Sequence, residues 1–192
     1  MVTSHALKRK TLVQAVLPTS LATGILTVLG GAGLTAVLAQ ISIPLPFTPV
    51  PITLQTMGAL LVGSALGSRK GFLSQLVYLL AGLVGLPVFA GGVGGSAHLF
   101  GATGGYIVGF LAAAYLAGLL AERGWDRSRR VVLAMVLADA ATFCLGMAWL
   151  VPFVGIAQVA AQGLLPFIPG EILKILLASG ALPLAWKVTR RT

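Results

Sequence analysis

Residues 122–151, ERGWDRSRR followed by VVLAMVLADAATFCLGMAWLV, decide the fold of this chain. The first nine residues contain four arginines, whereas the next 21 contain a single charged side chain, Asp139. About 20 apolar residues are enough for a helix to cross the hydrocarbon core of a bilayer. The stretch therefore predicts a transmembrane helix that starts at a basic edge of the membrane.

Basic residues recur in four patches, and the apolar runs between the patches predict the topology. Twelve of the 13 Lys and Arg residues fall in 8–10, 69–70, 123–130 and 187–191. If the chain crosses the membrane and returns between consecutive patches, all four lie on one side, which the positive-inside rule assigns to the cytoplasm. The exception is Lys174, at the opposite end of the last apolar run.

The apolar runs predict an all-α membrane protein with six transmembrane helices and cytoplasmic N and C termini. We expect one membrane domain for residues 1–192, with 1–19 as a cytoplasmic N-terminal segment. A seventh crossing at 152–169 would send the last basic patch to the other side, so we interpret it as an outer loop with a short interfacial helix. The six predicted runs are about 20–43, 52–66 (short), 71–90, 103–121, 131–151 and 171–188.

Composition excludes several classes of protein. Hydrophobic residues make up 57% and charged residues 9% of the chain, against roughly 45–50% and 25% in soluble proteins. The net charge of +9 lies beside apolar spans, so we predict a lipid bilayer and no nucleic acid as partner. The chain has no Walker loop, Ser-His-Asp set or zinc-binding helix, so we predict no enzyme, no metal and no cofactor.

Three loops on the predicted outer side are long, almost uncharged and rich in Pro and Gly. They cover residues 44–51, 91–102 and 152–170. Irregular apolar backbone is tolerated at a membrane where it packs on protein or lines a cavity. We therefore expect these loops to form a lid over a pocket.

Glu171 and Lys174 are the first candidates for a binding site, because they open the sixth run at the pocket end. At a spacing of three residues both can face one cavity. Lys174 would then receive an anionic group and Glu171 would accept hydrogen bonds from ligand donors. The alternative is a local ion pair with Lys174 extended toward lipid headgroups. Gln55 and Thr53, at the start of the short second run, suit a hydrogen-bonding ligand or helix capping.

Further candidates are less specific. Phe47, Phe89 and Tyr106 can wall an apolar cavity, although each is equally suited to ordinary packing. Asp139 lies about 12 Å inside the fifth run by helical rise. A carboxylate there must find a partner or a proton, and a structural partner such as Thr142 or a role in ligand binding are both open.

A stripe of small residues on the first run includes Ala32 and Ala36. Small residues allow helices to approach closely. The stripe predicts either packing inside the bundle or docking of another membrane protein.

Five blocks of sequence together form a distinctive pattern. The most extensive is QISIPLPFTPVPITLQT at 40–56, and the others are 78–79 (YL), 85–92 (GLPVFAGG), 101–106 (GATGGY) and 166–174 (PFIPGEILK). In this order the blocks resemble the BioY family, the biotin-specific S components of energy-coupling factor (ECF) transporters. In the last block Glu171 stands where the family more often has Asp, and in the 101–106 block Ala102 stands where Pro is usual.

The resemblance implies an ECF S-component-like bundle that binds one biotin beneath the outer loops, in the cell membrane. It also implies that Glu171 and Lys174 bind biotin, and we include Gly92 of the second loop among the predicted contacts. A transmembrane T protein and two ABC ATPases would supply the energy, with the stripe at Ala32 and Ala36 as the docking surface. The alternatives are an S component for thiamin or riboflavin and, from other classes, an intramembrane enzyme or a scaffold protein.

Overall fold

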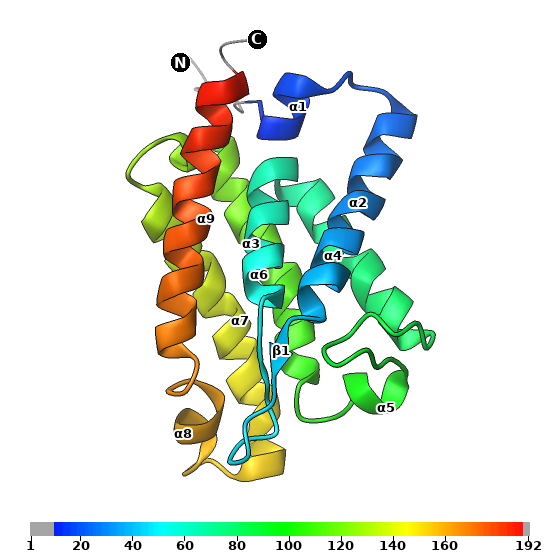
Figure 1. Ribbon diagram of the computed structural model, residues 1–192, viewed down its shortest axis with the longest axis vertical. Coiled ribbons are helices and arrows are strands. Elements are labelled where there is room, and N and C mark those ends of the chain that lie inside the picture. The colour runs from blue at the N-terminus through cyan, green and yellow to red at the C-terminus, as the bar shows by residue number, and fades with distance from the viewer. Residues whose placement is uncertain (1–9, 190–192) are drawn as a thin grey trace, which may run out of the picture.

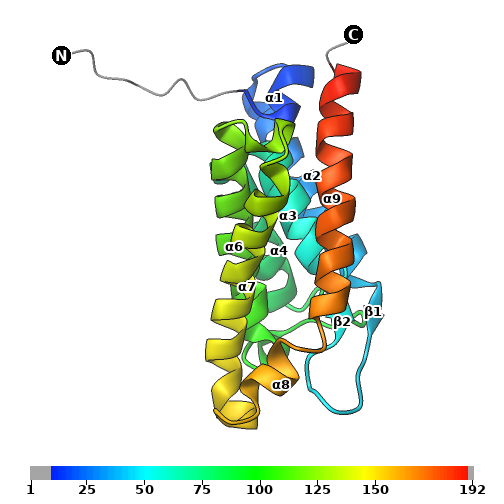
Figure 2. The ribbon, with the colours of Figure 1, turned by 90° about the vertical axis from the view of Figure 1, so that its left-hand side faces the viewer.

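The computed structural model describes residues 10–189, which form an elongated bundle of helices aligned with its long axis (Figures 1 and 2). The elements are α1 (Leu12–Val16), α2 (Leu21–Ala39), β1 (Ser42–Ile43), β2 (Ile52–Thr53), α3 (Gln55–Leu66), α4 (Ser68–Leu83), α5 (Ser96–Leu99), α6 (Gly104–Glu122), the 3-10 helix η1 (Trp125–Arg127), α7 (Val131–Val154), α8 (Val159–Gly163) and α9 (Ile168–Thr189).

Each of the six predicted apolar runs overlaps one of the longer helices α2, α3, α4, α6, α7 and α9. The third run was predicted too long, because α4 ends at Leu83 and the chain turns at Gly85, whose φ is +100°. The fifth was predicted too short, because α7 continues through Pro152 to Val154. A proline removes one backbone donor, and so close to the helix end the last turn still forms. The short helix predicted within 152–170 is α8.

Four segments are long and apolar enough to span a membrane: Leu21–Ala39, Gly104–Glu122, Val131–Val154 and Val159–Thr189, the last of which includes α8 and α9. Helices α3 and α4 are shorter, with 12 and 16 residues. They meet at Gly67, whose φ of +89° lets the chain reverse. Such a set of apolar helices is typical of a multi-pass membrane protein.

The outer surface of α9 is apolar and its inner surface carries the polar groups. Ile172, Leu173 and Leu176 are each more than half exposed, whereas Glu171 and Lys174 are buried. A soluble helix shows the opposite pattern. This arrangement suits a bundle whose exterior faces lipid and whose interior holds a polar site.

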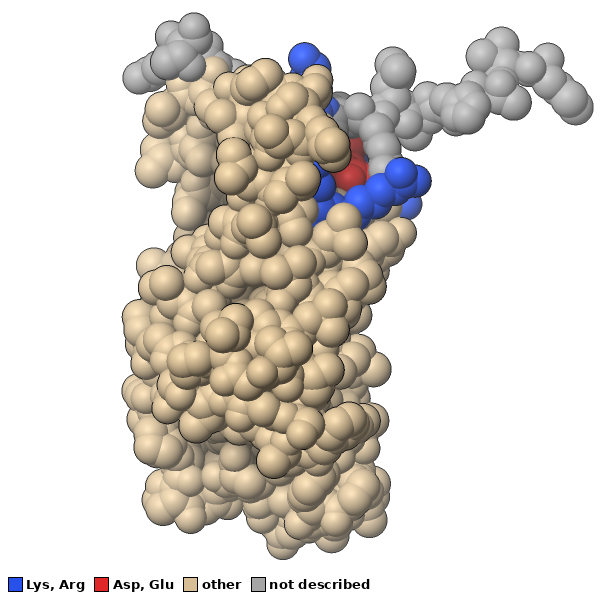
Figure 3. Space-filling view, turned by 90° about the vertical axis from the view of Figure 1, so that its right-hand side faces the viewer, with Lys and Arg blue, Asp and Glu red and all other residues tan. Residues whose placement is uncertain are grey.

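The two ends of the bundle differ in charge. The end that holds α1 and the last turns of α9 (Figures 1 and 2) carries ten of the charged side chains that the structure describes, and we call it the basic end. On the face shown in Figure 3 the charged residues gather at this end. Lys8, Arg9, Arg190 and Arg191 lie outside the described residues. The opposite end, formed by the β1–β2 hairpin, α5 and α8, is called the loop end.

Close helix contacts depend on small residues in the middle of the bundle. A Cβ on Gly63 of α3 would lie 2.3 Å from the Ala114 carbonyl oxygen of α6, and one on Gly118 would lie 2.4 Å from the Gly67 carbonyl carbon. Larger side chains would therefore push α3 and α4 away from α6. Glu122 also joins these helices at the basic end, because its Oε1 accepts hydrogen bonds from the Ser68 backbone N–H and hydroxyl, at 3.0 and 2.9 Å.

The stripe of small residues on α2 packs against the bundle in this structure, which is one of the two interpretations that the sequence left open. Ala32 is 7% exposed and packs with Tyr78 and Phe89, and Ala36 is partly buried against the same cluster. Both alanines thus belong to the contact between α2 and the bundle. The residues of α2 that remain open are others, including Gly30, which has no atom within 4 Å of a Cβ built on it.

Candidate functional site

A cavity at the loop end brings together polar and aromatic side chains from distant parts of the sequence. It contains about 500 Å³ of space between the protein atoms, including its opening to solvent. The cavity is lined by Val50, Pro51, Thr53, Gln55, Thr56, Ala90, His98, Thr103, Tyr106, Ile107, Phe110, Phe143, Phe167, Glu171 and Lys174.

Lys174 and Glu171 line the cavity from the first turns of α9. Lys174 Nζ donates to Glu171 Oε1 at 2.6 Å and to Thr56 Oγ1 at 3.1 Å, so the pair is tied to α3. Thr56 also lies 3.0 Å from Glu171 Oε2. Lys174 is only 4% exposed, which excludes an extended side chain that reaches lipid headgroups. An ammonium has three N–H donors, so one remains for a ligand.

Gln55 and Thr53 form a second polar group where β2 runs into α3. Thr53 donates its hydroxyl hydrogen to Gln55 Oε1 at 2.9 Å, and the Gln55 amide donates to the Tyr78 hydroxyl of α4. The antiparallel pairing of Ile52 with Ile43 holds β2 in place. Both side chains are buried and their orientation is fixed before any ligand enters, as specific recognition requires.

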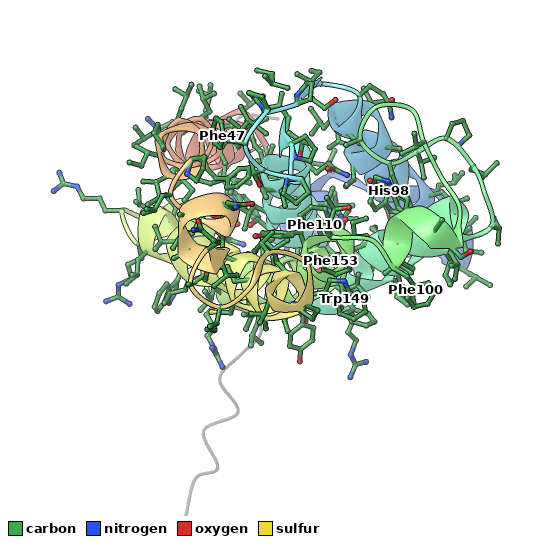
Figure 4. All side chains as sticks on the ribbon, turned by 90° about the horizontal axis from the view of Figure 1, so that it is seen from below. Phe47, His98, Phe100, Phe110, Trp149 and Phe153 are labelled. Carbon is green, nitrogen blue, oxygen red and sulfur yellow. The ribbon has the colours of Figure 1, made fainter. Side chains whose placement is uncertain are left out.

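Aromatic rings cover much of the remaining wall. Phe143 of α7 lies edge-on to Tyr106 of α6, with centroids 6.0 Å apart, and contacts Phe167 at 6.1 Å. The Tyr106 hydroxyl donates to the Gly163 carbonyl at 2.7 Å, which fixes the end of α8 beside the cavity. Phe110, one helical turn after Tyr106, lies near the middle of the bundle when the loop end faces the viewer (Figure 4).

His98 borders the cavity from α5 and was not predicted to belong to it. Its ring stacks on Phe89 with centroids 5.3 Å apart, and its Nε2 lies 3.4 Å from Thr103 Oγ1. Burial lowers the pKa of His98 below its ordinary value of 6.5, which favours the neutral imidazole at pH 7. A neutral ring can both donate and accept a hydrogen bond.

The structure places five of the nine predicted substrate-binding residues at the cavity: Thr53, Gln55, Tyr106, Glu171 and Lys174. The other four do not line it. Phe47 is 58% exposed and lies away from Phe110 in the end-on view (Figure 4). Phe89 is fully buried behind His98. Gly92 is exposed in the second loop.

Asp139 is the fourth of these residues, and it lies beside the cavity rather than in its lining. With Glu171 and Phe143 it lines a separate groove between α7 and α9. The partner suggested by the sequence, Thr142, forms no hydrogen bond with it, because Asp139 Oδ1 and Thr142 Oγ1 both lack partners among the described residues.

The sequence contained a usable signal for only some of the residues that were missed. Phe110 follows Tyr106 by four residues, and this spacing places both on one face of α6. Phe143 follows Asp139 by the same interval on α7. His98 carries no such signal, because its position depends on how the second loop folds onto Phe89.

The chemistry of the cavity suits a ligand with one anionic group, hydrogen-bonding groups and an apolar body. Lys174 offers the cation, and Thr53, Gln55, Thr56, His98 and Glu171 offer donors and acceptors. Beside aromatic walls the effective dielectric constant is lower than in water, which strengthens the attraction between the ammonium and an anion.

Comparison with known proteins identifies the family. The family model described as "BioY family" matches residues 8–191. The chain belongs to the BioY family. Among similar BioY proteins is the "Probable biotin transporter BioY" of Pyrococcus horikoshii, 43% identical over 141 residues that cover 73% of this chain and 82% of that protein. The "Biotin transporter BioY" of Rhizobium etli is 33% identical over 81% of this chain and 88% of its own length.

A solved structure has the same fold. It is described as "Crystal structure at 2.1 A of the S-component for biotin from an ECF-type ABC transporter". It superposes with a TM-score of 0.79 at 27% sequence identity, and covers 88% of this BioY chain and 95% of its own. The helical bundle of this chain is therefore that of an ECF S component.

Proposed function

We propose that this protein captures biotin at the loop-end cavity and takes it across the cytoplasmic membrane as the S component of an ECF-type ABC transporter. The observation that carries the proposal is the buried Lys174 in an aromatic cavity, in a chain whose relatives are named biotin transporters. It acts as a transporter component rather than as an enzyme, and needs no cofactor.

Biotin and the cavity are chemically complementary. Biotin has a carboxylate, a ureido ring with two N–H donors and one acceptor, and an apolar ring and chain. Lys174 binds the carboxylate, while Glu171 and Gln55 accept the ureido N–H groups. Tyr106 and Phe143 pack on the apolar part. A neutral analogue of biotin would leave the buried Lys174 ammonium without an anionic ligand group. Lys174 therefore also makes the cavity selective for an anionic ligand.

The proposed topology has six membrane crossings with both termini in the cytoplasm. It assigns the basic end to the cytoplasm, in accordance with the positive-inside rule, and the loop end to the outside. Helices α3 and α4 cross with short hydrophobic lengths, and the loops 44–51, 91–102 and 152–170 act together as a lid. The cavity then opens toward the side from which biotin arrives.

Transport requires partners that hydrolyse ATP, which we propose to be a T protein and two ABC ATPases. The T protein docks on an apolar groove near the basic end, between α2, α3 and α9. Gly30 and Leu34 of α2, Leu61 of α3 and Ala181 of α9 belong to its lining. We propose this groove in place of the stripe at Ala32, because Gly30, Leu34 and Ala181 are exposed whereas Ala32 is buried.

The test is to identify the ligand. The protein is purified in detergent from cells grown with biotin, the bound small molecule is released by denaturation, and mass spectrometry identifies it. Titration calorimetry with biotin, thiamin and riboflavin then compares affinities, and we expect binding of biotin alone. Retention of thiamin or riboflavin would instead support the alternative, an S component for another vitamin.

A further inference from the structure

Asp139 is a buried carboxylate that the binding site does not use. It is 4% exposed, near the middle of α7. Its neighbours Met135 and Ala138 pack with Ile175 and Ala178 of α9, so it lies close to the α7–α9 contact. Its Oδ1 atom is buried and has no hydrogen-bond partner among the described residues. An ionised carboxylate so placed is costly unless a charge or a proton compensates it.

The nearest charges belong to the binding site itself. Asp139 lines the groove between α7 and α9 together with Glu171, and Glu171 forms an ion pair with Lys174 at 2.6 Å. In the described part of the chain, these three are the charged side chains that lie away from the basic end. With all three ionised the cluster has one positive and two negative charges, a net charge of −1. The other titratable group at the cavity that can change charge near neutral pH is His98.

A ligand carboxylate at Lys174 would bring the net charge of the ionised cluster to −2. One of the two protein carboxylates is then favoured to accept a proton, because like charges in a poorly hydrated site repel strongly. Glu171 keeps its charge more easily, since Lys174 and Thr56 both donate hydrogen bonds to it. Asp139 Oδ1 receives none. Asp139 is therefore the carboxylate that accepts the proton.

We infer that Asp139 takes up a proton when an anionic ligand binds beside Lys174, so that ligand capture is coupled to proton binding. The proton comes from water or buffer and forms an O–H bond on the Asp139 carboxyl, and the net charge of the cluster stays constant as the anion enters. The inference rests on the proposed function, and it assigns to this BioY chain a charge-compensating residue outside the cavity lining.

The coupling has a definite sign. At pH values where Asp139 is ionised in the free protein, each binding event consumes a proton, so the dissociation constant rises with pH by up to about tenfold per pH unit. At lower pH, Asp139 already carries the proton and affinity is constant. Protonation of His98 would also favour an anion at low pH, so its contribution has to be separated.

The experiment is titration calorimetry of biotin with the detergent-purified protein from about pH 5.5 to about pH 9, where the biotin carboxylate stays ionised. Two buffers of different ionisation enthalpy are used at each pH, which gives the number of protons bound per biotin. For the wild type we expect an uptake of up to one proton. Asp139→Asn should remove the uptake and make the dissociation constant independent of pH over this range.

Two matched variants and one matched ligand complete the design. Thr142→Val changes another unpartnered buried group on α7 and should keep the proton uptake. His98→Gln removes the other titratable group together with a cavity contact, so it is expected to lower the affinity but to keep the number of protons bound per biotin. Biotinamide, which lacks the anionic group, should bind to the wild type without proton uptake. This last comparison needs no variant of the protein, and together with His98→Gln it tests the inference even where Asp139→Asn does not fold.

Each contrary outcome has one meaning. Biotin binding by the wild type without proton uptake overturns the inference and leaves the proposed function standing. Uptake that persists in Asp139→Asn, that disappears in His98→Gln, or that accompanies biotinamide assigns the proton elsewhere. If the affinity for biotin depends on sodium concentration and not on pH, a metal cation rather than a proton compensates the charge of the ligand. Absence of biotin binding at every pH overturns the proposed function and the inference with it.

Discussion

The Lys174 ammonium lies 2.6 Å from Glu171 Oε1, three residues earlier on the same helix, and both side chains are buried. A ligand carboxylate therefore meets a cation that already has an anionic partner. The two bonds of Lys174, to Glu171 and Thr56, fix its position. The ion pair and the binding role, which are alternatives at the level of sequence, are compatible in three dimensions.

Replacing Lys174 by Ala should weaken biotin binding by about 30-fold or more, since removing one partner of a desolvated ionic hydrogen bond costs about 2–5 kcal/mol. Titration calorimetry measures the loss. Biotinamide is the control ligand, because without a carboxylate it should lose much less affinity. Equal losses for the two ligands would show that Lys174 does not bind the carboxylate.

The same substitution leaves Glu171 buried without its cation, which can destabilise the fold by about 3–5 kcal/mol. Thermal unfolding of Lys174→Ala is therefore compared with that of the double variant Lys174→Met, Glu171→Gln, which buries no unpaired charge. We expect the double variant to be the more stable one and still to bind biotin poorly. Strong binding by a folded double variant would contradict the assignment.

Replacing Glu171 by Gln should weaken biotin binding less than Lys174→Ala does. The amide oxygen still accepts one hydrogen bond, whereas an ionised carboxylate has acceptor sites beyond those that Thr56 and Lys174 occupy. Parallel titrations of the two variants give the comparison. Tighter binding by Glu171→Gln than by the wild type would mean that the carboxylate serves only to hold Lys174.

The proposed docking groove predicts a separation of binding from transport. Gly30→Trp should fold, because no atom lies within 4 Å of a Cβ at that position, and it fills the groove between α2, α3 and α9. We expect unchanged biotin affinity in detergent, but loss of co-purification with the T protein and ATPases and loss of ATP-dependent uptake.

Gly180→Trp is the matched control for the groove. Gly180 has equally open surroundings but does not belong to the groove lining, so this variant should keep both the complex and the uptake. If the two variants behave alike, the T protein docks elsewhere. Ala32→Trp is unsuitable for this test, since Ala32 packs with Tyr78 and Phe89 and a larger side chain there would overpack the core.

The fold was predictable from sequence because apolar runs and basic patches report directly on membrane crossing. Lys174 was predicted to belong to a binding site on the same grounds, because it is the Lys or Arg residue that lies outside the four basic patches. The small residues of α2 indicated a close helix contact but not its partner, because small residues suit packing inside the bundle and docking of another protein equally well. Ala32 is buried against the bundle, whereas Leu29 is 51% exposed.

The conformation of the loops was the other feature that could not be predicted from the sequence. Phe47 and His98 both lie at the loop end, and the sequence favoured Phe47, which is exposed, over His98, which lines the cavity. The difference arises from contacts between residues far apart in the chain. One such contact joins Tyr106 to Gly163, 57 residues later.

Replacing Tyr106 by Phe should release α8 from the cavity while keeping the aromatic wall. The lost hydrogen bond to the Gly163 carbonyl is worth about 0.5–1.5 kcal/mol, so we expect the dissociation rate of biotin to rise by about two- to tenfold with little change in the association rate. Rapid mixing of the biotin-loaded protein with excess labelled biotin measures dissociation.

Tyr115→Phe is the control, because Tyr115 lies on the same helix, is 42% exposed and does not line the cavity. This variant should behave as wild type. An unchanged rate in Tyr106→Phe, or equal acceleration in both variants, would show that the 152–170 loop is not part of the lid.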